Sequence, residues 1–185
     1  HRQQGRSGLL TLISVRYTVA RRDAVDALNL ASQQLAARGS LRDSTREPLA
    51  GGRIDDFNGA LSAFQARRPG WLSEKSAVGM LRNYGTCAAQ LLALAQAEPH
   101  LARCFTGSHV TFAEAAYAVR AEMAQRMADI VFRRTELGTA GHPGTAALDE
   151  LQALLAQELG WSGQRIREER TLVEQHLQRY LAVAA

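Results

Sequence analysis

Apolar and polar residues follow a helical period along most of the chain, but the first apolar stretch is different. Residues 9–15 form one continuous aliphatic and β-branched run, which predicts a strand buried on both faces. Apolar residues then recur at helical spacing over residues 20–35, with Thr18 as the expected N-cap and Gly39 as the expected stop. The chain is therefore expected to open with a strand, a tight turn and a helix.

Every later periodic segment has helical spacing. The expected helices are residues 55–67, 72–84, 86–96, 111–137, 145–159 and 164–180. The longest is expected to begin with a capping box of Thr111 and Glu114 and to end at Gly138. Two pairs of opposite charges four residues apart would support it: Glu122 with Arg126, and Asp129 with Arg133.

Residues 39–53 are polar and contain Gly, Ser and Pro, which predicts a linker between two parts. Because one strand cannot make a sheet, residues 1–38 are expected to be the last strand and helix of an α/β domain. Residues 54–185 are expected to form a complete helical bundle domain. The predicted fold class is mainly α.

Composition and charge narrow the functional classes. The 185 residues are 46% hydrophobic and 22% charged, as in a soluble globular protein. The net charge is +4, but arginines alternate with acidic residues, so we expect no nucleic-acid partner. The polar N-terminus predicts no signal peptide. Cys87 and Cys104 have no metal-site spacing, so we expect reduced core cysteines in a reducing compartment.

Three stretches carry a family resemblance. Residues 10–21, LTLISVRYTVAR, resemble the last strand and following helix of the flavin domain in FAD-dependent glycerol-3-phosphate dehydrogenases. Residues 45–53, TREPLAGGR, are similar to the Pro-Leu-Pro-Gly-Gly linker of that family. Residues 114–138 resemble the signature helix of its C-terminal domain, and residues 83–85 and 159–161 fit the same domain. The resemblance covers nearly the whole chain in the right order.

The chain also departs from the family pattern. Arg16 stands where the family usually has Lys, Ser14 where Gly is common, and Val19 in place of a second Thr. The family's Gly-x-Gly-x-x-Gly dinucleotide fingerprint, which lies near its N-terminus, has no counterpart here. This 185-residue fragment is therefore expected to be inactive alone and to hold no FAD.

The resemblance implies a reaction for the parent enzyme. That enzyme oxidises sn-glycerol 3-phosphate to dihydroxyacetone phosphate, passing a hydride to FAD and electrons to quinone. The residues expected beside the flavin ring are Ser14, Val15, Arg16, Tyr17 and Thr18. Helix-end amides and the Arg16 cation there would stabilise negative charge around flavin N1 and the C2 carbonyl. In the alternative, Arg16 is a surface cation and Thr18 only a cap.

Other polar residues favour structural roles. An arginine could hold a substrate phosphate, but pairing with Glu122, Asp129 or Glu136 is favoured for Arg120, Arg133 and Arg134. Adjacent acids point about 100° apart on a helix, which predicts solvated side chains for Asp55, Asp56, Glu168 and Glu169. Surface or capping roles are expected for His100, His109, His142 and His176. Hydroxyls that reach a partner at the core edge are expected for Tyr84 and Tyr117. No metal site is expected.

Location and partners follow from the resemblance. We expect a cytoplasmic protein whose full-length form uses glycerol 3-phosphate and quinone. Peripheral association with the inner membrane and a homodimer stay open. The mixed charges of residues 164–180 argue against that helix as a membrane anchor. The competing hypothesis is a stand-alone helical protein-interaction module without enzymatic activity.

Overall fold

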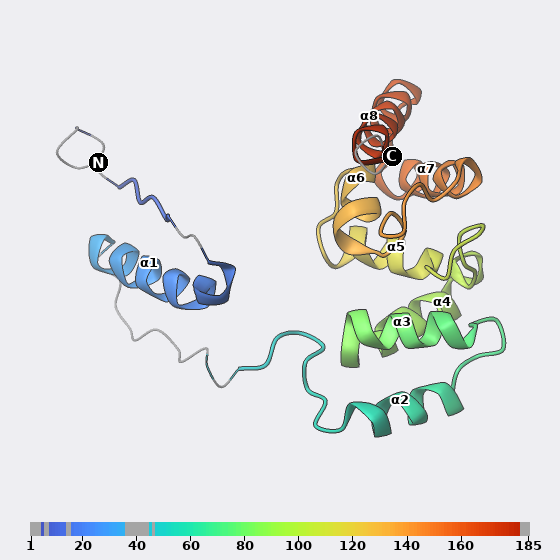
Figure 1. Cartoon of the computed structure of the whole chain (residues 1–185), viewed down its shortest axis with the longest axis horizontal. Coiled ribbons are helices and arrows are strands. Elements are labelled where there is room, and N and C mark those ends of the chain that lie inside the picture. The colour runs from blue at the N-terminus through green and yellow to red at the C-terminus, as the bar shows by residue number, and fades with distance from the viewer. Residues whose placement is uncertain (1–4, 6–7, 14–15, 36–44, 46, 182–185) are drawn as a thin grey trace. The chain divides into compact units, whose positions relative to one another are not determined.

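The structure is a computed structural model that describes residues 5, 8–13, 16–35, 45 and 47–181 of the chain. Its regular secondary structure is helical throughout these residues, so the mainly α prediction is confirmed. The chain divides into two units, His1–Glu47 and Pro48–Ala185 (Figure 1).

The first unit is one helix with an extended segment before it. Residues 9–13 are exposed and form no strand, because no described segment pairs with them; Ser14 and Val15 lie outside the described residues. A 3₁₀ turn, Tyr17–Val19 (η2), leads into α1, Ala20–Gln34. The Thr18 N-cap prediction is wrong, since Thr18 lies within the turn and Val19 occupies the N-cap position of α1 without a side-chain bond.

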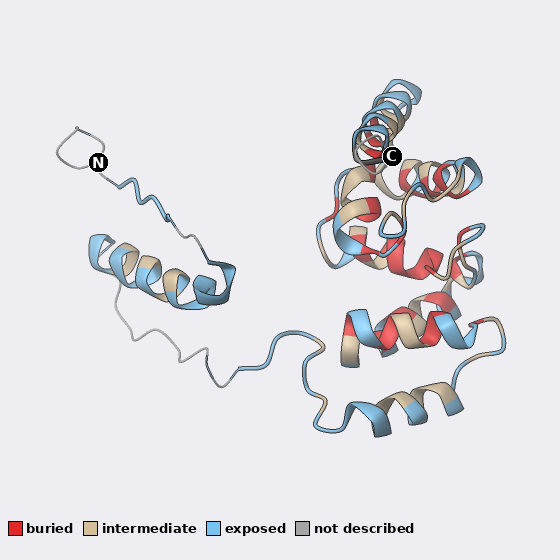
Figure 2. Cartoon of the chain, viewed as in Figure 1, coloured by how far each residue is buried: buried red, intermediate tan, exposed pale blue. Residues whose placement is uncertain are grey.

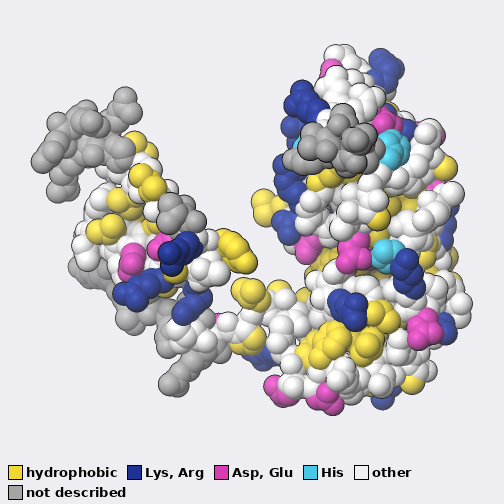
Figure 3. All heavy atoms as spheres, viewed as in Figure 1, with side chains coloured by type: hydrophobic (Ala, Val, Ile, Leu, Met, Phe, Trp, Pro, Cys, Tyr) yellow, Lys and Arg dark blue, Asp and Glu magenta, His cyan; other side chains and the backbone are white. Residues whose placement is uncertain are grey.

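No side chain of α1 is buried (Figure 2). Hydrophobic side chains therefore lie at the surface of this unit (Figure 3), among them Leu28 and Leu30. The helix ends at Gln34, and the predicted stop at Gly39 lies outside the described residues. The first unit thus has no core of its own in the described residues.

The second unit contains the remaining helices. They are α2 Phe57–Ala66, α3 Glu74–Tyr84, α4 Ala88–Ala97, α5 Phe112–Arg120, α6 Met127–Asp129, α7 Thr145–Leu159 and α8 Gly163–Leu181. Side-chain caps fix several starts: a backbone N–H donates to Asp56 at α2, to Ser73 at α3 and to Ser162 at α8. The α7 helix ends at the left-handed Gly160, as predicted. Apart from residues 111–137, each predicted helix is confirmed to within a few residues.

The single helix predicted over residues 111–137 is wrong. The helix α5 ends at Arg120, the chain then passes through Met123 in a left-handed conformation (φ 62°), and α6 begins at Met127. From α6 the chain continues as a π-helical turn, Ile130–Arg134 (η5), short of the predicted end at Gly138. The predicted pair of Glu122 with Arg126 does not form.

Two carboxylates start α6 after the break. Asp129 nearby accepts the backbone N–H groups of Gln125 and Arg126, and the other carboxylate comes from elsewhere in the chain. Glu169 of α8 accepts a hydrogen bond from the backbone N–H of Met127 at 3.0 Å and from Arg126 Nε at 3.1 Å. A carboxylate at a helix N-terminus satisfies orphan N–H groups and complements the helix dipole. A tertiary contact therefore overrides the continuous helical pattern.

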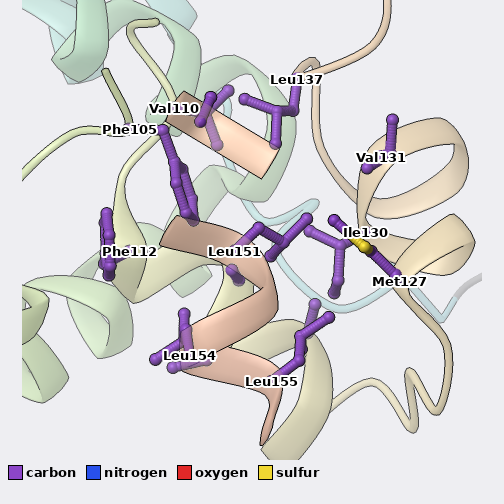
Figure 4. Close-up of a cluster of buried hydrophobic side chains, with 14 of the residues drawn as sticks. Phe105, Val110, Phe112, Met127, Ile130, Val131, Leu137, Leu151, Leu154 and Leu155 are labelled. Atoms are coloured by element: carbon purple, nitrogen blue, oxygen red, sulfur yellow. The ribbon is translucent and has the colours of Figure 1, made fainter. Parts of the chain in front are cut away.

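Two hydrophobic clusters form the core of the second unit. The larger one joins α5, α6, η5, α7 and α8 with the segment before α5, and its members include Phe105, Phe112, Met127, Ile130 and Leu151 (Figure 4). The smaller one lies around α3 and α4, with Leu72, Met80 and Leu91 fully buried. Each such side chain contributes about 1.5–3 kcal/mol. Trp71 packs against both clusters.

Candidate functional site

The predicted flavin-contact turn is open in this unit. Arg16 has an extended backbone (φ −134°, ψ 115°) and its carbonyl accepts a hydrogen bond from the N–H of Val19 at 3.2 Å. Tyr17 is 92% exposed, and Arg16 and Thr18 are exposed as well. Ser14 and Val15 lie outside the described residues. The turn is thus accessible from solvent on the first unit alone.

The chemistry of this turn suits an anion. The first N–H groups of a helical segment have no acceptor within the helix and form the positive end of its dipole. The turn Tyr17–Val19 runs directly into α1, so the amides of Tyr17 and Thr18 occupy this position beside the Arg16 cation. These groups can stabilise negative charge on a ring placed against them.

The three arginines that could have held a phosphate do not converge. Arg120 of α5 binds the carboxylates of both Glu98 and Glu158; its Nε lies 2.7 Å from Glu158 Oε2. These hydrogen bonds raise the pKa of Arg120 and lower the pKa of Glu98. Arg120 therefore ties α5 to the segment after α4 and to α7.

The other two arginines are occupied within their own segment. Arg133 pairs with Asp129 four residues earlier at 2.9 Å, as predicted. Arg134 donates to the backbone carbonyl of Glu122 at 3.1 Å. The sequence analysis favoured structural pairing for these arginines. It did not predict the partners of Arg120, because they come from segments far away in the sequence.

Histidines form surface contacts, in line with the prediction. His142 pairs with Glu174 of α8 at 2.9 Å, and its Nδ1 accepts the N–H of Gly144 at the start of α7. His109 pairs with Glu136 at 2.7 Å. That contact lowers the pKa of Glu136. His176 stacks against Phe132 with ring centres 4.3 Å apart.

One hollow of about 570 Å³ lies beside α3 in the second unit. The His109 ring covers Gly79 on its floor, where an added Cβ would lie 3.4 Å from His109 Cδ2. Acidic and basic side chains both line it: Glu74, Lys75, Arg82, His109 and Glu136. This mixture favours no charge sign, and the described residues contain no group of acids, histidines and cysteines that could hold a metal.

The burial of two acids, Glu169 and Glu114, was not predicted from the sequence. Glu169 is only 1% exposed, so its predicted solvation is wrong, whereas its neighbour Glu168 is exposed. The Glu169 carboxylate also accepts a hydrogen bond from Arg165 Nη2 at 2.7 Å. Glu114, the acid of the predicted capping box, is buried, and burial raises its pKa to about 7. Position within a charged helix gave no signal for the burial of Glu169.

Tyr84 belongs to the smaller core, and Tyr117 and Cys87 pack against it. The Tyr84 hydroxyl donates to the carbonyl of Arg134 at 3.3 Å, and the Tyr117 hydroxyl donates to Gln90 at 3.1 Å. Both hydroxyls thus reach partners, as predicted. Burial raises the pKa of Tyr84. Cys87 and Cys104 are free cysteines of intermediate burial.

Comparison with known proteins identifies the second unit. A family model described as the C-terminal domain of alpha-glycerophosphate oxidase matches residues 43–166, a range that contains helices α2 to α7. The chain belongs to this family. No solved structure matches it. The resemblance found in the sequence is therefore confirmed for the alpha-glycerophosphate oxidase C-terminal domain.

Longer relatives extend the match. Glycerol-3-phosphate dehydrogenase 2 of Mycobacterium tuberculosis and of Mycobacterium bovis are each 30% identical over 169 residues. A probable mitochondrial glycerol-3-phosphate dehydrogenase of Dictyostelium discoideum is 28% identical over 167 residues. Each match covers 88% of this chain, but the chain spans only 28% of the mycobacterial and 25% of the Dictyostelium protein. A match of this extent reaches beyond the second unit into residues 1–47.

No helix in the described ranges is long and apolar enough to cross a bilayer. Charged side chains of both signs are intermingled over the visible face of the second unit (Figure 3). The second unit thus presents a surface with charged side chains of both signs. Some of these side chains form ion pairs between helices.

Proposed function

We propose that this chain is the C-terminal portion of an FAD-dependent glycerol-3-phosphate dehydrogenase. The parent reaction is the oxidation of sn-glycerol 3-phosphate to dihydroxyacetone phosphate. The observation that carries the proposal is the match to glycerol-3-phosphate dehydrogenases over 88% of this chain but only about a quarter of their length. Most of such a relative therefore lies outside the region matched here, and the fragment is proposed to be inactive by itself.

The turn at residues 14–18 is proposed to contact the flavin. When bound, FAD accepts the hydride that leaves C2 of the substrate. Arg16 and the amides of Tyr17 and Thr18 would then stabilise the negative charge of the reduced ring. The exposed, amide-presenting geometry of Arg16–Thr18 supports this role. Ser14 and Val15 complete the proposed contact.

The surface of the first unit supports its membership of a larger domain. Ile13, Leu28 and Leu30 are more than half exposed. An isolated helix the length of α1 is marginal in water, and none of the described residues up to Leu35 is buried. We propose that these side chains pack against the rest of a flavin-binding domain.

The second unit is proposed to support the catalytic part without contributing reacting groups. Tyr84, Arg120 and the buried Glu169 are occupied by contacts within the unit. It has its own hydrophobic core around α5 and α7. Such a domain can shape or cover one side of the enzyme.

A chimera tests this function. The part of the Mycobacterium tuberculosis relative that matches this chain would be replaced by residues 1–185, and glycerol-3-phosphate-dependent reduction of an artificial electron acceptor would be measured. We expect activity and bound flavin in the chimera. We expect neither in the isolated chain nor in the truncated relative, which is the Mycobacterium tuberculosis protein without the part that matches this chain. Undiminished turnover of the truncated relative would contradict the proposal and favour a separate helical interaction module.

The electron acceptor is proposed to be a membrane quinone, with the enzyme on the cytoplasmic face of the inner membrane. The active chimera would be assayed with a soluble quinone analogue and by co-sedimentation with lipid vesicles. We expect quinone reduction and vesicle binding. Activity with the artificial acceptor alone would support the dehydrogenase proposal and contradict the quinone proposal.

A further inference from the structure

The segment before α2 is held against the end of α3 by two glycines. Residues Leu49–Gly52 form a turn, in which the N–H of Gly52 donates to the carbonyl of Leu49 at 2.8 Å. Gly51 is the third residue of this turn and has φ 83°. A type II turn requires positive φ at this position, which favours glycine.

The second glycine, Gly85, lies directly after α3 and has φ 55°. The N–H of its neighbour Thr86 donates to the carbonyl of Gly51 at 3.0 Å. A Cβ on Gly51 would overlap the carbonyl oxygen of Tyr84, and a Cβ on Gly85 would overlap the carbonyl oxygen of Gly51. The two backbones therefore approach so closely that each glycine is needed by the other; we call this contact the Gly51–Gly85 clasp.

The same segment is held at a second point. The Ile54 side chain packs against the smaller hydrophobic cluster. Within the segment, the N–H of Ile54 donates to the carbonyl of Gly52 at 3.0 Å. Cys87 lies beneath the clasp, with Sγ 3.7 Å from the position of a Cβ on Gly51. Residues 48–54 thus have hydrogen bonds, an apolar anchor and a close backbone contact, which a flexible linker lacks.

We propose that residues 48–54 are a docked strap of the helical domain, and that the Gly51–Gly85 clasp fixes the direction in which the chain enters that domain. Gly51 and Gly85 are then positioning residues. The part of the predicted linker that joins the two units lies before Pro48. The proposal rests on contacts within the second unit; only its consequence for turnover rests on the proposed function.

Alkylation of Cys87 in the full 185-residue chain tests the docking. The chain would be treated with N-ethylmaleimide, and the rate at each cysteine followed by peptide mass spectrometry. Gly51→Ala and Gly85→Ala are each expected to raise the Cys87 rate roughly tenfold, because a side chain in that backbone conformation is strained and overlaps its neighbour. Cys104, whose Sγ lies 3.4 Å from Ser76 Oγ, is the internal reference thiol.

Gly70→Ala is the matched control, because a Cβ there meets nothing within 4 Å. It should change neither rate. An unchanged Cys87 rate in both clasp variants would overturn the docked strap. An equal rise at Cys104 would also overturn it, because the glycines would then support the whole core and not a local joint.

The positioning role has its own readout in the active chimera described above. Gly51→Ala is expected to lower the turnover number several-fold while leaving the KM for glycerol 3-phosphate unchanged, with Gly70→Ala as the control. If Gly51→Ala keeps full turnover but raises the reactivity of Cys87, the positioning role is refuted and the docking of residues 48–54 is supported. An inactive parent chimera would count against the proposed function, and the alkylation result would still decide the strap.

Discussion

Glu114 accepts hydrogen bonds from both the backbone N–H and the hydroxyl of Thr111, at 2.7 Å and 2.9 Å, while it is buried in the second unit. Burial raises its pKa to about 7, from an ordinary value of 4.5. Because the folded-state pKa is the higher one, this group's contribution to stability is complete below about pH 4.5 and is lost as the pH rises through 7.

A glutamine at this position separates the capping box from its titration. Glu114→Gln keeps an acceptor for Thr111 but binds no proton. Between pH 5 and pH 8 the unmodified chain should lose about 2 kcal/mol more unfolding free energy than the variant. Urea unfolding at both pH values measures this difference, and parallel losses in the two proteins would refute the assignment.

Removal of the carboxylate at Glu169 should destabilise the second unit strongly. Glu169→Ala leaves the N–H of Met127 without its acceptor and deprives Arg126 and Arg165 of their partner. We expect a loss of about 2–4 kcal/mol in urea unfolding. The matched control is Glu168→Ala at the exposed neighbouring position, which should stay within about 0.5 kcal/mol. Equal effects at the two positions would contradict the capping role.

Arg120 should matter more to stability than Arg133, although both form ion pairs. Arg120 joins two acids from other segments, Glu98 and Glu158, whereas the exposed Arg133 pairs only with Asp129 in its own turn. Since Arg120 is 37% exposed at its side chain, solvent screening limits the cost of Arg120→Ala to about 1–2 kcal/mol. Arg133→Ala should cost less than about 0.5 kcal/mol. Thermal unfolding at low and high salt checks both values.

Arg16 should influence the flavin in the active chimera. Loss of the cation in Arg16→Ala removes charge stabilisation of the reduced ring, so the two-electron reduction potential should become more negative by about 20–40 mV. Arg16→Lys should leave the reduction potential close to that of the unsubstituted chimera. Arg22→Ala on α1 serves as the charge-matched control. If all three variants have the same reduction potential as the unsubstituted chimera, Arg16 is a surface cation.

The helices could be predicted because their causes are local. Periodic apolar positions, the capping box of Thr111 and Glu114, and the stop at Gly160 all act within a turn or two of the residue concerned. The same reasoning failed at residues 121–126, because one of the acceptors that start α6 comes from α8. It also failed for a strand over residues 9–13, since a strand depends on a paired neighbour.

The candidate site divides in the same way. The turn at Arg16 was found by resemblance, and its exposure on the first unit is a structural finding. The partners of Arg120 and the burial of Glu169 depend on helices that meet only after packing. The close approach of Gly51 and Gly85 likewise joins segments whose sequence shows only glycine-containing stretches.

The contact between Glu169 and Met127 also orders events during synthesis. The two residues are 42 positions apart, and the acceptor is the later one. As the chain leaves the ribosome, the segment that becomes α6 emerges well before the carboxylate that completes its first turn. Its final geometry must therefore wait until α8 has been translated and released. The larger core, to which Met127 and Ile130 both belong, would then close only after α8 has emerged.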